Sequence, residues 1–229
     1  MIQFLGKCMC YSIVAIALDL IWGYTGMLSL GHGIYFCLGG YCMAMYLRLR
    51  ESGGEIIDFM KTGGLTKLPG FWKPFLNLPL TFLLILVVPG VLAGVIGFFV
   101  FRSRIKGVYF SIITQALTWA AYSLFIANSK YTGGNNGITD FPSMFGSTRV
   151  SAHKGNLLAL FFTALVILIL IYILASFLVN SKFGKLLIAI RDGENRTYFS
   201  GYCVNNYKNF IYTLSAILTG IGGGLFFNF

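Results

Sequence analysis

Charged side chains are scarce in this sequence. Only 10% of its 229 residues are Asp, Glu, Lys or Arg, whereas 57% are hydrophobic. About a quarter of the residues in a soluble domain are charged, so this composition excludes an ordinary soluble protein. Uncharged runs of at least about 18 residues are typical of membrane-spanning helices, because the hydrocarbon core is about 30 Å thick. The sequence therefore predicts an all-α integral membrane protein with a single transmembrane domain, residues 1–229.

The motifs of common catalytic sites are also missing. The sequence has no GxxxxGK[ST] phosphate loop and neither GxSxG nor HExxH. It has two histidines, His32 and His153, and five cysteines without CxxC spacing. These absences predict a protein that is not an enzyme and holds no cofactor or metal. The net charge of +10 comes from basic residues in loops, which indicates contact with lipid headgroups and no nucleic-acid partner.

Apolar runs predict about six transmembrane helices, at residues 4–22, 33–47, 75–101, 107–128, 155–181 and 209–229. Pro79 and Pro89 lie in the third run and predict a kink there. In the last run, Ala216, Gly220 and Gly224 have the four-residue spacing of small residues that lets helices approach closely. Polar loops are expected at residues 48–73 and 129–154.

A broken helix is expected between the first two spans, near residues 23–33. Its sequence, GYTGMLSLGHG, has four glycines. Interrupted backbone at membrane depth is tolerated where protein or a water-filled cavity satisfies its polar groups, and transporters place such breaks at the substrate path. An ordinary tight turn is the alternative. Asp19, just before this stretch, is the one clear carboxylate within a span, and we expect it to have a structural role.

The basic residues divide evenly between the two sides of the membrane if the spans alternate. One side holds Arg102, Arg104, Lys106, Lys182, Lys185, Arg191, Arg196 and Lys208. The other holds Arg48, Arg50, Lys61, Lys67, Lys73, Lys130, Arg149 and Lys154. The first set is denser and closer to span ends, where the positive-inside bias is strongest, so we place it in the cytoplasm.

A charged, amphipathic segment at residues 181–202 separates the last two spans. Leu186, Leu187 and Ile190 share one face at helical spacing, and the opposite face is polar: Lys185, Asp192, Asn195 and Arg196. Such a helix can dock into a groove of a soluble protein or lie on anionic lipid headgroups. The residue pattern leaves both alternatives open.

Four collinear stretches resemble the permease family of branched-chain amino acid and urea ABC transporters. They are WGYTGMLSLGHGIYFCLGGYCMAMYL, TGGNNGITDF, FGKLLIAIRDGENRTYFSGY and YKNFIYTLSAILTGIGGGLF. Within the family the sequence is most similar to the second permease subunit of urea transporters. The resemblance implies a multi-pass subunit of the bacterial inner membrane. Its expected partners are a sister permease, two cytoplasmic ATP-binding subunits, an extracytoplasmic substrate-binding protein and membrane lipid.

The resemblance also implies roles for particular residues. The stretch from Gly184 to Gly201 matches the family's coupling helix, the cytoplasmic segment that contacts the ATPase, so Gly184, Arg191, Glu194 and Gly201 are candidate coupling positions. Gly193 lies inside this helix, where glycine costs about 1 kcal/mol relative to alanine, and predicts two short pieces. Family members extend further at both ends, so this chain is expected to be shorter than the family pattern.

Urea is the expected substrate, with branched-chain or other amino acids as the alternative. Urea needs paired hydrogen-bond donors and acceptors without a fixed countercharge. Candidate residues for the substrate path are Tyr24, Thr25, Ser29, His32, Thr114, Gln115 and Thr118. A rival function is that of a stand-alone secondary transporter or channel, which would need no ATPase.

Overall fold

The computed structural model describes residues 1–65, 67–103, 105, 107–138, 154–227 and 229, and in this part of the chain it contains helices and no strand. This confirms the all-α fold. The longer helices are α1 (Ile2–Thr25), α2 (His32–Glu51), α4 (Leu78–Arg102), α5 (Val108–Ala127), α7 (Lys154–Asn180), α8 (Lys182–Phe199) and α9 (Val204–Phe226). The short ones are α3 (Asp58–Thr62), η1 (Gly70–Leu76), α6 (Ser129–Thr132) and η2 (Gly134–Asn136).

Five helices in the described part are long and apolar enough to cross a membrane: α1, α4, α5, α7 and α9. The remaining predicted span, residues 33–47, forms α2 and is not among these five. This helix does not need to be uniformly apolar, because it lies inside the bundle with most of its residues buried. Its polar C-terminal end, from Arg48 to Glu51, continues beyond the predicted run.

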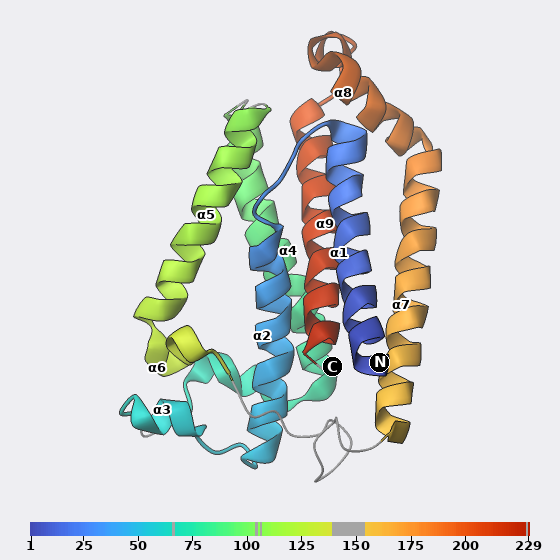
Figure 1. Ribbon diagram of the computed structural model, residues 1–229. Coiled ribbons are helices and arrows are strands. Elements are labelled where there is room, and N and C mark those ends of the chain that lie inside the picture. Colours follow the sequence, from blue (N-terminus) through green and yellow to red (C-terminus); the bar gives the residue numbers. More distant parts are fainter. Residues whose placement is uncertain (66, 104, 106, 139–153, 228) are drawn as a thin grey trace.

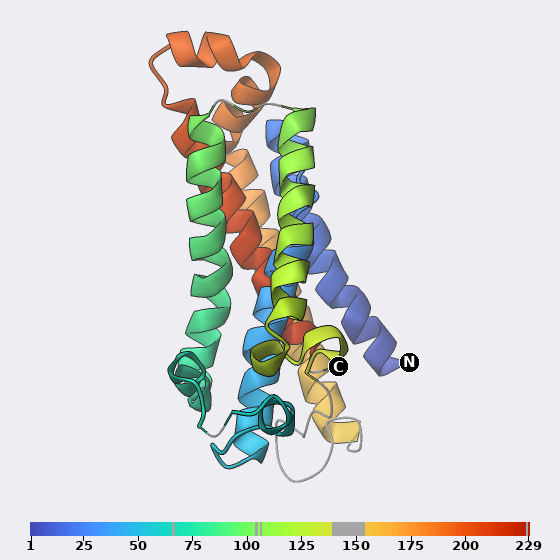
Figure 2. The same ribbon diagram turned by 90° about the vertical axis from the view of Figure 1, so that its left-hand side faces the viewer.

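Helix α9 is at the centre of the bundle. It packs against α4, α2 and α1, and α7 packs on the far side of α1 (Figure 1). Helix α5 contacts α2, α6 and η2 and lies at the edge of the bundle, in front in Figure 2. Helices before and after the long polar regions of the sequence thus pack against one another.

Small residues bring α9 close to its neighbours, as the four-residue spacing predicts. Ala216 is fully buried. A Cβ on Gly220 would lie 2.7 Å from Pro89 Cγ of α4, and one on Gly39 of α2 would collide with the Gly220 carbonyl. Helices α2, α4 and α9 can approach this closely because glycine has no side chain at positions 39 and 220.

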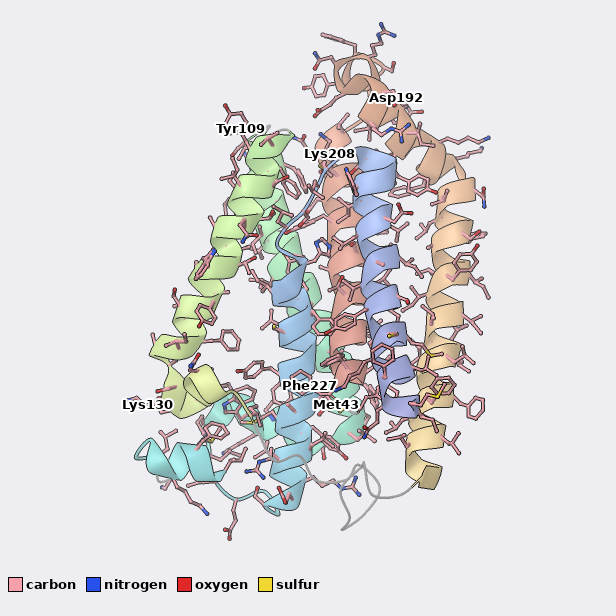
Figure 3. The ribbon with its side chains drawn as sticks, viewed as in Figure 1. Met43, Tyr109, Lys130, Asp192, Lys208 and Phe227 are labelled. Atoms are coloured by element: carbon pink, nitrogen blue, oxygen red, sulfur yellow. The ribbon has the colours of Figure 1, made fainter. Side chains whose placement is uncertain are left out.

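The two ends of the bundle differ in the segments that they carry. The last turn of α4, the first turn of α5 and α8 lie at one end, called the α8 end below, and α3, η1 and α6 lie at the opposite end. Figure 3 shows Tyr109, Asp192 and Lys208 at the α8 end and Lys130 at the other. This agrees with the expected division of basic residues for the described positions. Arg104, Lys106 and Arg149 are outside the described residues.

Both expected polar loops contain short helices. Residues 48–73 include the end of α2, all of α3 and the start of η1, and residues 129–154 begin with α6 and η2. The third span also begins later than expected, at Leu78, because η1 occupies residues 70–76. Pro79 lies in the first turn of α4 and Pro89 lies inside it. Residues 139–153 of the second loop are outside the described part.

Candidate functional site: an interrupted helix, an apolar pocket and a coupling helix

The predicted break between the first two helices is present. Helix α1 ends at Gly26, whose backbone is left-handed with a φ of 70°, and α2 begins at His32. We call residues 26–31 the interrupted segment. It runs from the α8 end of α1 into the bundle before α2 begins (Figure 1). This is a break within the bundle and not the tight interhelical turn that was the alternative.

Hydroxyl groups of α5 satisfy the backbone of the interrupted segment. Ser111 Oγ donates to the Leu28 carbonyl oxygen at 2.6 Å, and Thr114 Oγ1 accepts from the Leu30 amide nitrogen at 3.1 Å. Ser111 and Thr114 are themselves buried. Side-chain partners of this kind are what broken backbone needs at membrane depth. They also make α5 the helix that holds the segment in place.

His32 joins the start of α2 to the segment and to α9. Its Nδ1 lies 2.9 Å from Ser29 Oγ, and its Nε2 lies 2.9 Å from Ser215 Oγ. Ser215 also donates its single hydroxyl hydrogen to the Ala17 carbonyl of α1. The Ser215 oxygen must therefore accept from Nε2–H, which leaves Nδ1 to accept from the Ser29 hydroxyl. Both nitrogens of a neutral imidazole are satisfied within the protein.

An aromatic cluster surrounds this hydrogen-bond network. The Tyr35 and Tyr212 hydroxyl oxygens lie 2.6 Å apart across the α2–α9 interface, and the two residues are fully buried. Phe101 of α4 and Phe110 of α5 contact the Tyr212 ring. This cluster connects α2, α4, α5 and α9 around one point, so the network belongs to the packed core.

The seven residues predicted for the substrate path do not line one common surface. Thr25, Ser29, His32 and Thr114 are buried, and each makes a hydrogen bond inside the protein. Gln115 is exposed and lines a separate hollow beside Leu30 of the interrupted segment. Tyr24 lies in a groove between α1 and α7, together with Asp19 and Tyr172. Thr118 alone lines the pocket described next.

A pocket of about 330 Å³ lies between α2 and α5. This α2–α5 pocket is lined by Gly33, Ile34, Cys37 and Tyr41 of α2, by Thr118, Ala121, Tyr122, Phe125 and Ile126 of α5, and by Gly134, Asn135 and Gly137 near η2. Its volume is in the range of small-molecule sites, about 300–1,000 Å³. It begins where the interrupted segment ends and reaches Gly134, Asn135 and Gly137 in the second polar loop.

Sequence reasoning missed most of the pocket residues, because aromatic and aliphatic side chains on a helix look like core or lipid contacts. A spacing signal is nevertheless present in α5. Thr118, Ala121, Tyr122 and Phe125 recur at three- and four-residue intervals, which places them on one helix face. The pattern identifies the face, and only the fold shows that it meets α2.

The segment at residues 181–202 forms the predicted amphipathic helix, α8. Ser181 begins it by accepting from the Phe183 amide nitrogen at 3.2 Å. Leu187 and Ile190 are buried against the bundle, whereas Leu186 is half-buried. Leu186 lines an outer groove of about 320 Å³ with Ala189, Asp192, Gly193, Arg196, Thr197, Ser200 and Tyr202. The polar face is exposed as expected, so α8 presents a groove away from the spans.

The four predicted coupling positions do not share one surface. Gly184 is buried at the corner between α7 and α8, where a Cβ would collide with the Val179 carbonyl. Gly201 has a φ of 87° and ends α8. The Arg191 side chain is 43% exposed, yet its guanidinium binds the Gly23 carbonyl of α1. Glu194 pairs with Lys208 of α9.

Asp19 lies near the end of α1, and its structural role stays a prediction. It is exposed in the α1–α7 groove, and a Cβ on Gly23 would lie 2.6 Å from its Oδ1. The carboxylate thus folds over the glycine one turn later. Among the described residues, no group of three or more His, Cys, Asp or Glu side chains is placed to hold a metal ion.

A bundle of apolar helices with an interrupted segment beside a partly open pocket is the fold of a multi-pass membrane protein. The model of the family described as branched-chain amino acid transport system / permease component matches residues 1–229. The chain belongs to this family, which consists of transport components and not of enzymes. No solved structure matches it.

Three curated relatives carry the same kind of description. The chain is 25% identical over 240 residues to the high-affinity branched-chain amino acid transport system permease protein LivM of Escherichia coli. That alignment covers 95% of this chain and 50% of the relative. The probable branched-chain amino acid transport permease protein LivM of Methanocaldococcus jannaschii is 24% identical over 227 residues, covering 94% of this chain and 64% of the relative. The chain spans about half the length of the LivM proteins of Escherichia coli and Salmonella typhimurium.

Proposed function

We propose that this chain is the membrane-spanning permease component of an ATP-driven importer of branched-chain amino acids in the bacterial inner membrane. The family match supports the permease role. The relatives are described as branched-chain amino acid permeases, which fits the amino-acid alternative better than the urea prediction. We therefore take a branched-chain amino acid, and not urea, as the substrate.

The observation that carries this proposal is the lining of the α2–α5 pocket. Ile34, Cys37, Ala121 and Phe125 give it an apolar wall, and Thr118 is among its few polar side chains. Ligand sites with this composition bind apolar groups and use a few polar atoms for orientation. The aliphatic side chain of a branched-chain amino acid gains free energy by entering such a site. Its ammonium and carboxylate groups find no charged partner among the lining residues, so they must stay hydrated or contact the polar atoms at the pocket edge.

The outer groove of α8 is the proposed contact with the ATP-binding subunits. Asp192 and Arg196 are exposed there, and the groove lies at the end of the bundle placed in the cytoplasm (Figure 3). A sister permease and an extracytoplasmic substrate-binding protein complete the proposed assembly. Hydrolysis occurs in the partner subunits, and this chain moves the substrate without covalent chemistry.

Uptake into proteoliposomes tests the substrate and the energy source together. The chain is reconstituted with its ATPases, sister permease and binding protein, and labelled leucine or urea is supplied outside. Leucine uptake that requires internal ATP is the expected result. Uptake of urea without leucine would contradict the substrate assignment, and uptake by the chain alone without ATP would instead support the stand-alone transporter.

Cys37 gives a direct test of the pocket. It lines the α2–α5 pocket, and Cys203 is exposed in the turn between α8 and α9. Two variants are prepared, each retaining one of these cysteines and replacing the others by serine. In the complex, leucine presented by the binding protein should slow maleimide labelling of Cys37 and leave labelling of Cys203 unchanged. Equal labelling of Cys37 with and without leucine would exclude this pocket from the path.

A further inference from the structure

Helix α8 is two helical pieces joined at Gly193. The backbone there has a φ of −163° and a ψ of 71°, which is extended and not helical. The Thr197 hydroxyl donates to the carbonyls of Ala189 at 3.1 Å and Gly193 at 3.2 Å, so it bridges the two sides of the bend. The predicted division of this helix is therefore present, with Arg191 before the bend and Glu194 after it.

The first piece of α8 is attached to the end of α1. Arg191 Nη1 donates to the Gly23 carbonyl oxygen at 2.8 Å, and its Nε donates to Asp192 Oδ1 at 3.0 Å. Gly23 is in the last turn of α1, where carbonyls lack partners within the helix and a cation is favourable. This turn has no basic residue of its own. The Arg191 side chain also lies over Gly26, where a Cβ would be 3.1 Å from its Cγ.

The second piece of α8 is attached to the start of α9. Lys208 Nζ lies 2.8 Å from Glu194 Oε1, and the Lys208 side chain is only 7% exposed. An ion pair shielded from water in this way is screened little by salt. Loss of one member leaves a buried charge without its partner. The pair therefore fixes the position of the second piece relative to α9.

We propose that Arg191 and Glu194 are positioning residues that transmit movement of α8 to α1 and α9, and that they are not contacts with the ATPase. This inference rests on the proposed function, because it assumes that an ATPase binds the outer face of α8. A change of angle at Gly193 would shift the end of α1 relative to the start of α9. The two attachments lie on opposite sides of the bend, so each helix follows one piece.

Both helices lead to the α2–α5 pocket. The end of α1 continues into the interrupted segment, whose Leu28 and Leu30 are bonded to α5. Helix α9 reaches the same region through Ser215, which binds His32 at the start of α2. A relative shift of α1 and α9 therefore acts on the segment from both ends, next to Gly33 and Ile34 of the pocket.

The test uses the complete complex and two variants that remove the attachments without leaving a buried charge unpaired. Arg191→Met removes the bond to Gly23, and the double variant Glu194→Leu/Lys208→Met removes the ion pair. Each should retain its ATPases on co-purification and still hydrolyse ATP, while uptake per ATP falls at least about fivefold, the lower end of typical coupling between sites. ATP should also stop changing the labelling rate of Cys37.

Conservative changes separate transmission from a merely structural role. Arg191→Lys keeps a cation near Gly23, and Glu194→Lys/Lys208→Glu keeps an ion pair with its charges exchanged. Both should restore part of the uptake lost in the first variants. Arg196→Met is the matched control, since Arg196 is exposed in the outer groove of α8. It should weaken co-purification of the ATPases, whereas Arg191→Met and the double variant should retain them.

Two results would overturn the inference. One is loss of the ATPases from Arg191→Met, which would make Arg191 a contact residue. The other is unchanged uptake in both the Arg191→Met and the double variant. A wild-type chain that retained no ATPase would instead contradict the proposed function, and the co-purification step distinguishes that failure from the other two.

Discussion

His32 at the start of α2 and Ser215 in the middle of α9 are joined by a buried hydrogen bond of 2.9 Å. Ser215 also donates to the Ala17 carbonyl, so a single hydroxyl connects α1, α2 and α9. The two ring nitrogens of His32 hold the interrupted segment against the bundle.

Ser215→Ala should destabilise the protein. The change removes the acceptor of His32 Nε2–H and the donor to the Ala17 carbonyl, and a buried polar group left unsatisfied costs about 1–3 kcal/mol. Thermal unfolding of the purified complex in detergent measures the loss. Ser12→Ala is the control, because that hydroxyl is exposed and bonds within its own helix to the Cys8 carbonyl. Equal melting temperatures for the two variants would refute the role of Ser215.

Gly223→Ala should disrupt the contact between α9 and α2. A Cβ at this position would collide with the Phe36 carbonyl, and backbone cannot move aside as a flexible side chain can. Overpacking costs about 1–3 kcal/mol or more. Gly94→Ala in α4 is the control, since its Cβ would have its nearest contact at 3.6 Å, with Thr213 Oγ1. Helix propensity favours the alanine there by about 1 kcal/mol.

Expression level and unfolding temperature of the two glycine variants provide the measurement. We expect Gly223→Ala to be less stable than wild type and Gly94→Ala to be equal or more stable. A stable Gly223→Ala protein would show that α2 and α9 are further apart than the structure places them.

Ala121→Phe should inhibit uptake by filling the α2–α5 pocket. Ala121 lines the pocket, whereas the neighbouring Ala120 is exposed and is not among the lining residues. Ala120→Phe therefore adds the same volume to the outer face of α5. At equal amounts of complex in the membrane, leucine uptake should fall in the first variant and persist in the second. Equal uptake in both would exclude the pocket from the substrate path.

Much of the fold could be predicted from the sequence. The apolar runs indicated every helix that is now a candidate span, and the glycines from Gly23 to Gly33 indicated the break after α1. Gly193 indicated the bend in α8, and Gly220 and Gly224 indicated close packing. These signals are local: they depend on helix length, backbone freedom and side-chain size, which neighbouring residues already specify.

The partners of the polar residues could not be predicted in this way. The charges of Arg191 and Glu194 indicated a water-facing helix, but one binds the end of α1 and the other binds Lys208. Similarly, the hydroxyls of Ser29 and Thr114 suggested a substrate path, and only the structure shows that they also hold the interrupted segment. Polar residues in spans commonly bond neighbouring helices, and the sequence does not say which helices are neighbours.

The sequence by itself determined that this protein is a helical membrane protein with an interrupted segment and a bent amphipathic helix between its last two spans. Only the tertiary structure decided which helix faces enclose a pocket and which face lipid. The physical reason is that lipid tails and a protein interior are equally apolar, so hydrophobicity does not distinguish a residue such as Phe125 in the pocket from one on the outer surface. Whether Phe125 lines a pocket or faces lipid depends on how α2 and α5 pack.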